Sequence, residues 1–218
     1  MKSITKKRLI LASQSPRRRE LLTQAGLEFE IVPADIQEIM IPSESPDDYV
    51  KRLSREKAQF VAQKFEDLKF SPDTILNQIK DEIKASQTIW VLGADTTVVM
   101  GSQILEKPTS KDDAKFMLKT LSGNVHTVYT GFTLCCQSEN RLITNLVKTD
   151  VLFKELTDKE IDWYVATDEP FDKAGAYAIQ GLGAFMVKSI NGSYSNVVGL
   201  PVCEVVDILI KENVIKMD

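Results

Sequence analysis

The amino-acid sequence predicts an α/β fold in which a mixed, strongly twisted β-sheet is flanked by helices. Short apolar runs rich in β-branched residues alternate with segments of helical periodicity, which is the pattern of strands connected by helices. Other strand-like runs are separated only by short turn sequences, as hairpins require. Crossovers and hairpins in one chain give a mixed sheet. The 218 residues, 43% of them hydrophobic, suffice for one domain or two closely joined lobes with a sizeable core.

The N-terminal part of the chain predicts two strands and two helices. The runs "RLILA" and "FEIVPA" are short, apolar and typical of strands. Between them, Ser15 is a favoured N-cap, Pro16 suits the first helical position and Gly26 suits the C-terminal cap. A longer helix starts at Ser45 in "SPDDYVKRLSREKAQFVAQKF", since a proline and two acids occupy its first turn. In order, these elements cover residues 8–12, 16–25, 29–34 and 45–65.

The middle of the chain predicts a surface helix followed by two hairpins. A polar segment rich in lysine and glutamate, residues 70–87, suits the surface helix. The run "TIWVLGAD" predicts a buried strand that ends at Gly93 and Ala94, and "TVVMGSQILEK" continues as a hairpin around Gly101. A helix and two paired strands complete this part, at residues 110–121, 125–136 and 142–153.

The C-terminal part predicts regular elements separated by irregular structure. A helix over residues 157–166 is followed by "FDKAGAYAIQGLGA", whose glycines favour no regular period. The pair Asn191-Gly192 is a strong turn signal and predicts a last hairpin. A final helix begins at Pro201.

Charge and cysteine content exclude several classes of function. The chain carries 27 Lys and Arg against 31 Asp and Glu, a formal charge of -4, so a nucleic-acid polymer is a poor candidate partner. Its three cysteines show no C-x-x-C spacing, which argues against a zinc site or a disulfide framework. No apolar run has membrane-spanning length, and the N-terminal one is too short for a signal peptide. We therefore expect a cytoplasmic protein without nucleic-acid or membrane partners.

Three consecutive arginines follow Ser15-Pro16 at the start of the first predicted helix. A helix N-terminus carries partial positive charge, so arginines there are unfavourable unless an anion binds nearby. At about 100° per residue, Arg18 falls within the apolar face, Arg17 on its flank and Arg19 outside it. One interpretation is a structural ion pair or a solvated charge run. The other is a phosphate held by backbone N–H groups of the first turn and by guanidinium groups.

Further charged residues are candidates for catalysis. Lys57 falls within the apolar stripe of the second helix, where it either faces something polar or snorkels. Asp95 follows the predicted strand end, and a carboxylate there acts as a general base, binds a divalent metal or is a plain turn residue. Glu106 and Lys107 precede a proline at a strand-to-helix junction, where an exposed loop pair is the alternative. His126, the sole histidine, suits a packed strand position better than a catalytic one.

A set of motifs runs in order along nearly the whole chain: "LILASQSPRRRELL", "REKA", "LGADT", "LEKP", "LSG", "DEPFDKAGAYAIQGLG" and "INGSYSNVVGLP". Together they resemble the Maf family of nucleoside triphosphate pyrophosphatases. The resemblance implies a cytoplasmic, usually dimeric enzyme with two lobes around a central cleft. It also implies cleavage of the α–β phosphoanhydride of a nucleotide with a divalent cation, Mg²⁺ or Mn²⁺. "DKAGAYAIQG" is similar to the branch that acts on dTTP and UTP.

The resemblance also implies roles for individual residues. Asp95 would be the catalytic base and share the metal, with Glu38 and Glu106 as weaker metal ligands. The arginines and lysines of the motifs would neutralise a triphosphate of about four negative charges. The amide of Gln180 both donates and accepts, so it can pair with a uracil or thymine edge, and Arg17 and Thr96 share its link to base choice. The implied substrate-binding residues are Ser13, Arg17, Arg18, Lys57, Thr96, Lys107 and Gln180.

One departure and two alternative functions accompany the resemblance. The chain is longer than compact family members between "REKA" and "LGADT", so we expect residues 66–88 to form a surface helical insertion in a single Maf-like domain over residues 1–218. One alternative function is a nucleotide-binding regulator of septum formation whose hydrolysis is incidental. The other is the branch of the family that acts on methylated GTP.

Overall fold

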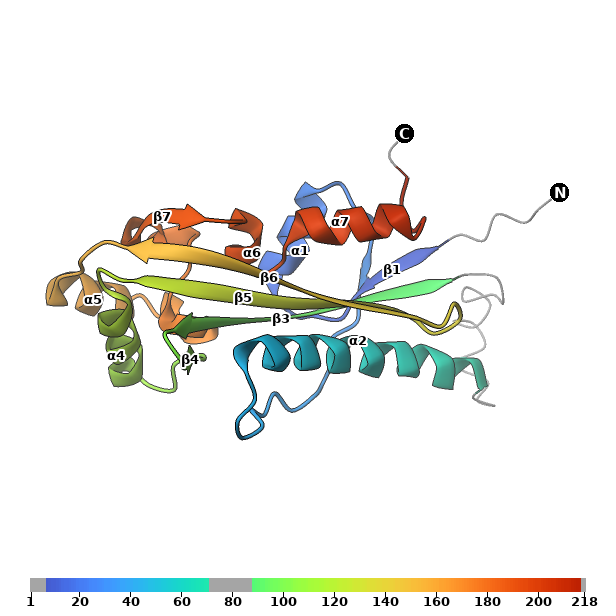
Figure 1. Ribbon diagram of the computed structural model, residues 1–218, viewed down its shortest axis with the longest axis horizontal. Coiled ribbons are helices and arrows are strands. Elements are labelled where there is room, and N and C mark those ends of the chain that lie inside the picture. The colour runs from blue at the N-terminus through green and yellow to red at the C-terminus, as the bar shows by residue number, and fades with distance from the viewer. Residues whose placement is uncertain (1–6, 71–87, 217–218) are drawn as a thin grey trace.

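The computed structural model describes residues 7–70 and 88–216, and these form a seven-stranded mixed sheet with helices on both faces (Figure 1). The strand order is β2-β1-β3-β5-β6-β7, and β4 pairs with β3 beside this path. β1 is parallel to β2 and β3, whereas all other pairs are antiparallel. The predicted mixed α/β fold is therefore confirmed. The strands are β1 (Arg8–Leu11), β2 (Glu30–Ile31), β3 (Ile89–Met100), β4 (Gln103–Leu105), β5 (Val125–Cys136), β6 (Arg141–Phe153) and β7 (Val187–Asn191).

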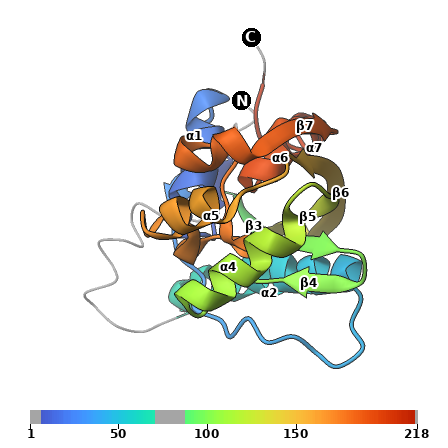
Figure 2. The same ribbon diagram turned by 90° about the vertical axis from the view of Figure 1, so that its left-hand side faces the viewer.

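Helices cover the two faces and one end of the sheet. Figure 1 shows α2 along one face, with α1, α6 and α7 on the opposite face, and Figure 2 shows α4 and α5 at one end. Among the described residues, no helix is both long enough and apolar enough to span a lipid bilayer. The helices are α1 (Pro16–Gln24), α2 (Pro46–Phe70), α4 (Lys111–Leu121), α5 (Asp158–Val165), α6 (Tyr194–Val198) and α7 (Val202–Lys211), with short 3-10 helices η2 (Glu169–Asp172), η3 (Ala174–Ala176) and η4 (Gly181–Met186).

Alternate side chains of β3 pack into cores on opposite faces of the sheet, as the two-residue period of a strand requires. Trp90 and Leu92 are buried in a cluster that includes Leu209 of α7. Val91 is buried in a second cluster that includes Ala58 of α2. The sheet is therefore covered on both faces, and its central strand is buried throughout most of its length.

The backbone of α2 lies directly on the sheet at two glycines. A Cβ atom at Gly93 of β3 would lie 2.3 Å from the Ser54 carbonyl oxygen and 2.7 Å from the Ala58 nitrogen. A Cβ atom at Gly131 of β5 would lie 2.4 Å from the Val50 carbonyl oxygen. Only glycine permits this approach, so these two positions fix how closely α2 packs against the strands.

Two predicted strand boundaries were wrong. β3 does not end at Gly93 and Ala94 but continues through Asp95 to Met100, because β5 pairs with it along this stretch. The glycine that indicated a strand end instead permits the contact with α2. The predicted strand over residues 29–34 shortens to β2, which has two residues.

The predicted hairpin at Asn191-Gly192 was also wrong. β7 ends at Asn191 and pairs with β6, and the chain then turns into α6, whose N-cap is Ser193. Gly192 has a φ of +131°, so the position does favour glycine, but the element that follows is a helix. Of the predicted surface insertion, residues 66–70 belong to α2 and residues 71–87 lie outside the described residues.

Candidate functional site

A cavity of about 520 Å³ lies beside the middle of β3. The pairing of β1 with β3 ends at Leu11 and Leu92, and the pairing of β4 with β3 begins at Val98. In the part of the chain that the structure describes, no strand pairs with this side of β3 between those points. The cavity occupies the gap beyond the carboxyl end of β1, which is where open α/β sheets bind ligands.

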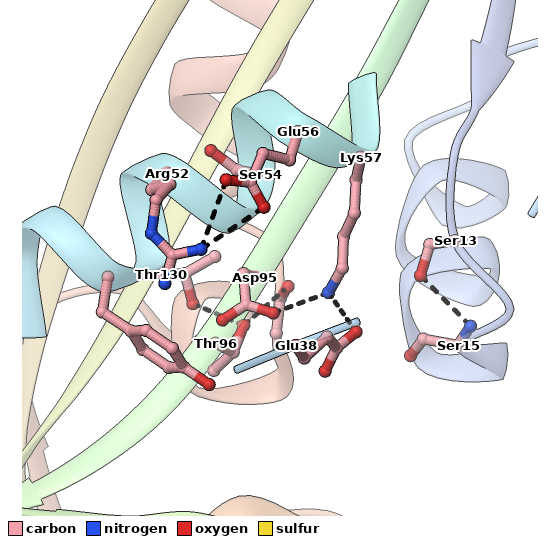
Figure 3. A network of polar contacts seen from close by, with 12 residues as sticks. Ser13, Ser15, Glu38, Arg52, Ser54, Glu56, Lys57, Asp95, Thr96 and Thr130 are labelled. Carbon is pink, nitrogen blue, oxygen red and sulfur yellow. Dashed lines mark hydrogen bonds and ion pairs between the residues drawn. The ribbon is translucent and has the colours of Figure 1, made fainter. Parts of the chain in front are cut away.

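The ammonium group of Lys57 lies between two carboxylates of this cavity. Lys57 Nζ is 2.7 Å from Asp95 Oδ1 and 2.6 Å from Glu38 Oε1, and Figure 3 shows the lysine extending from α2 toward both acids. Lys57 and Asp95 are buried, whereas Glu38 is exposed. Lys57 reaches Asp95 because α2 rests on Gly93, two residues earlier in β3. The predicted inward orientation of Lys57 is confirmed.

Burial and charge act in opposite directions on these two acids. Burial raises the pKa of Asp95 above its ordinary value, although the charge and the hydrogen bond of Lys57 act to lower it. Burial also acts to raise the pKa of Glu38, but Lys57 and Lys107 together outweigh it and hold that pKa below its ordinary value. Burial therefore favours proton uptake by Asp95, whereas the neighbouring lysines favour the ionised form of Glu38.

The guanidinium group of Arg18 is buried and held by three neutral oxygens on the other face of β3. Its Nε donates to the Gly199 carbonyl oxygen at 2.8 Å, Nη1 to Ser13 Oγ at 3.1 Å and Nη2 to Thr96 Oγ1 at 3.1 Å. Burial lowers the pKa of Arg18, although Asp95 opposes this shift. The guanidinium group of arginine stays charged in proteins even so. Ser13 and Thr96 therefore fix the arginine as well as line the cavity.

A further hydrogen-bond network holds Thr96 in place through Thr130 and Asn196. Thr130 Oγ1 lies 2.9 Å from Thr96 Oγ1 and donates to the Asn196 carbonyl oxygen at 3.2 Å. The buried Asn196 side chain in turn donates to the Val128 carbonyl oxygen and to Thr149 Oγ1. These bonds fix α6, whose C-cap Gly199 holds Arg18.

Arg17 lies at the outer rim of the cavity. Its Nη1 donates to Asp172 Oδ2 at 3.3 Å, in an ion pair that is partly exposed. Asp172 also bonds the neighbouring Lys173, which lines the same cavity. Asp172 and Lys173 were not predicted as site residues from the sequence. Their signal was present in "FDKAGAYAIQG", but the segment folds into 3-10 turns whose faces no simple period reveals.

The remaining predicted residues lie around the same cavity. Glu106 accepts a hydrogen bond from the Tyr49 hydroxyl at 2.6 Å, and Tyr49 was not predicted as a site residue. Lys107 has no carboxylate within 4.0 Å among the described residues. Gln180 is half-buried, and the described residues give its side-chain amide no hydrogen-bond partner. Both side chains are therefore available to a ligand.

The structure brings every residue predicted for the site to one cavity. Five cationic side chains and four carboxylates line it, which suits a polyanion that arrives with a metal ion. The predicted residues are Ser13, Arg17, Arg18, Glu38, Lys57, Asp95, Thr96, Glu106, Lys107 and Gln180.

The acidic residues of the cavity suit a divalent cation that also takes ligands from a substrate. Over residues 7–70 and 88–216, no group of three or more His, Cys, Asp or Glu side chains could hold an ion by itself. Asp95 and Glu38 nevertheless lie close together, since both contact Lys57 Nζ. Mg²⁺ is commonly bound by one or two carboxylates, with phosphates and water as its other ligands. The donor set therefore fits a divalent cation that binds together with a polyphosphate.

Comparison with known proteins gives a consistent picture. Residues 8–212 match the family model Maf, described as "Maf-like protein". A protein of Syntrophus aciditrophicus (strain SB) is 46% identical over 202 residues, which cover 93% of this chain and 88% of that protein. A relative from Geotalea uraniireducens (strain Rf4) is 49% identical, and the match covers 94% of this chain and 94% of that protein. A relative from Geobacter sulfurreducens is 47% identical, and the match covers 93% of this chain and 95% of that protein. All three are named dTTP/UTP pyrophosphatase.

Proposed function

Because the chain belongs to the Maf family, we propose that it is a nucleoside triphosphate pyrophosphatase that hydrolyses dTTP and UTP to the monophosphate and pyrophosphate. The names of its relatives support this substrate class. The observation that carries the proposal is the buried Asp95 carboxylate, held at 2.7 Å by Lys57 in a cavity lined by cations. A base beside a polyanion site is what hydrolysis of a phosphoanhydride requires.

Asp95 acts as the general base in this proposal. Burial raises its pKa, so the carboxylate takes a proton from water more readily than an exposed aspartate does. The deprotonated water attacks the α-phosphorus, the α–β anhydride bond breaks and pyrophosphate leaves with the bonding electrons. Lys57 orients the carboxylate and stabilises its charge before the proton is taken.

The cations bind the phosphate groups and the charge that develops on them. Lys107 is free of ion pairs among the described residues, and Arg18 is held only by neutral groups, so both are available to phosphate oxygens. The N-terminus of α1, capped by Ser15, also lines this cavity, and the partial positive charge of a helix N-terminus favours an anion there. Electrostatic stabilisation of this kind is the main source of catalysis in reactions of phosphoanhydrides.

Asp95 and Glu38 would hold the divalent cation, Mg²⁺ or Mn²⁺, with Glu106 near them. When bound, the ion neutralises phosphate charge next to the base. The half-buried Gln180 amide would pair with the pyrimidine edge, and Arg17 and Thr96 line the same cavity. The same family membership leads us to expect a cytoplasmic homodimer.

A pyrophosphate-release assay tests the proposal. The purified protein is given dTTP, UTP, CTP and methylated GTP, each with and without Mg²⁺ or Mn²⁺. We expect release from dTTP and UTP in the presence of metal. A nucleotide-binding regulator would instead bind a triphosphate tightly without releasing pyrophosphate, and preference for methylated GTP would assign the chain to the other branch.

A further inference from the structure

The loop that carries Gln180 is fixed by a carboxylate outside the cavity. Glu169 Oε1 accepts hydrogen bonds from the Gly183 backbone N–H at 3.1 Å and from the Tyr164 hydroxyl at 3.0 Å. Glu169 Oε2 accepts one from the Leu182 backbone N–H at 3.1 Å. The carboxylate thus binds the backbone N–H groups of Leu182 and Gly183 in the first turn of η4, which follows Gln180 directly.

Tyr164 connects this carboxylate to the chain that leads into Gln180. The buried tyrosine hydroxyl donates to Glu169 and accepts a hydrogen bond from the Ala178 backbone N–H at 3.3 Å. Burial raises the pKa of Tyr164, so the hydroxyl keeps the proton that it donates. The backbone is therefore anchored two residues before Gln180 and two residues after it.

Two glycines allow the loop to wrap closely around these side chains. Gly181 has a φ of +69°, and a Cβ atom there would lie 3.0 Å from Glu169 Oε2. A Cβ atom at Gly183 would lie 2.5 Å from the Ala178 carbonyl oxygen and 2.8 Å from the Tyr164 hydroxyl. The loop has little freedom to shift while the Glu169 carboxylate is in place.

Glu169 also contacts one residue that lines the cavity. Its backbone carbonyl oxygen accepts a hydrogen bond from Lys173 Nζ at 2.6 Å, and Lys173 lines the cavity on the side of Arg17 and Asp172. Glu169 thus bonds directly to one residue that lines the cavity, Lys173, and its carboxylate fixes the backbone that follows another, Gln180.

We propose that Glu169 is a positioning residue for base selection, whose carboxylate sets where the Gln180 amide stands and how wide the base site is. The inference rests on the proposed function, because it requires Gln180 to face the base. A carboxylate accepts all three hydrogen bonds at once. A glutamine of the same shape has one acceptor oxygen and would turn an NH₂ group toward a backbone N–H.

The test is Glu169→Gln, with kcat and KM measured for dTTP and for methylated GTP by pyrophosphate release. We expect the preference for dTTP over methylated GTP, as a ratio of kcat/KM values, to fall about tenfold. The change should come mainly from a higher KM for dTTP, because the contacts of Asp95 and Lys57 do not involve Glu169. Tyr164→Phe removes one donor to Glu169 and the acceptor of Ala178, so it should shift the ratio in the same direction.

Glu160→Gln is the matched control. Glu160 also accepts a backbone hydrogen bond, from Thr157 at 2.8 Å, but it caps α5 away from the cavity. It should lower the melting temperature and leave the substrate ratio unchanged. The inference is overturned if Glu169→Gln and Tyr164→Phe lower the melting temperature but keep the wild-type ratio. Wild-type protein that shows no preference for dTTP would overturn the proposed function itself, before any variant is compared.

Discussion

Two polar clusters lie on opposite faces of β3, one residue apart. Asp95 points toward α2, where Lys57 carries the opposite charge at 2.7 Å. Thr96 points to the other face, where it accepts a hydrogen bond from Arg18. Both cations are buried, yet Lys57 is paired with carboxylates, whereas Arg18 donates only to hydroxyl and carbonyl oxygens such as that of Gly199.

The difference shows how one strand can serve two tasks. A buried cation without a carboxylate partner is costly, and Arg18 has none within ion-pair distance among the described residues. Its charge is available to an incoming anion. The Lys57–Asp95 pair is internally neutral and holds a carboxylate ready to take a proton. We therefore expect damage to the cluster around Arg18 to reduce binding and damage to the Lys57–Asp95 pair to stop turnover.

The largest effect is expected from Asp95→Asn. The amide keeps the shape of the side chain and an oxygen for Lys57, but it does not act as a base, so kcat for dTTP should fall about 100-fold or more while the fold remains intact. Pyrophosphate release and circular dichroism measure the two outcomes. Asp150→Asn, on β6 away from the cavity, serves as the control. Near-normal hydrolysis by Asp95→Asn would remove the proposed base.

A smaller effect is expected from Arg18→Lys. Lysine keeps the charge but cannot donate at once to Ser13, Thr96 and Gly199 from a planar fork. The value of kcat/KM should fall about tenfold, mainly through KM, and the free energy of unfolding by about 1–3 kcal/mol. Steady-state kinetics and urea titration measure both. Arg19→Lys, at an exposed position, is the control, and an unchanged KM in Arg18→Lys would contradict the binding role.

The third prediction compares the two faces of the sheet by replacing one buried threonine of β5 on each face, Thr130 and Thr133. Thr130→Val removes the hydroxyl that supports Thr96 and the Asn196 carbonyl, so kcat/KM should fall about threefold and stability by about 1 kcal/mol. Thr133→Val removes a hydroxyl bonded to Ser54 and Thr144, away from the cavity. It should lose similar stability and no activity. Equal activity losses in both variants would show that the support of Thr96 is not specific.

The last prediction concerns His126 and Tyr177, a buried polar pair without charge. Substitution of His126 should leave turnover at neutral pH unchanged. His126 Nε2 lies 2.7 Å from the Tyr177 hydroxyl, and burial lowers the pKa of His126 to about 4. An unfolded histidine takes up a proton below about pH 6.5, so the unfolded state binds more protons between these values and stability falls as the pH is lowered. From pH 7 to pH 4 this group should cost about 3 kcal/mol.

Urea titrations across this pH range on the wild type and on His126→Gln isolate that contribution. The variant lacks the titrating ring, so its stability should depend less steeply on pH. Identical slopes in the two proteins would mean that His126 is not held neutral in the fold.

Much of the architecture follows from local patterns. Caps and apolar periodicity located α1 and α2. A cation within an apolar stripe is visible in the sequence, which is why Arg18 and Lys57 were found. Such a charge cannot face a core without a partner, so its phase on the helix already predicts a polar site.

The features that sequence reasoning missed depend on contacts between distant segments. Nothing near Asp95 reveals that β1 stops short and leaves β3 open beside it. The pair Asn191-Gly192 signals a turn, but the helix that follows it is fixed by Asn196 across the sheet. Asp172 lies in a segment of 3-10 turns, where no helical or strand period assigns a face. Long-range packing decides these cases, and local propensity does not.

Because α2 contacts the sheet at Gly93 and Gly131, the distance between Lys57 and Asp95 does not depend on the sizes of the apolar side chains around the helix. Main chain touches main chain at both points, so the sizes of neighbouring apolar side chains do not set the reach of Lys57 toward Asp95. Substitutions elsewhere in the interior can therefore raise or lower heat resistance without retuning that separation. A single methyl group at either glycine is enough to end this independence, since it would lift the helix away from the strands.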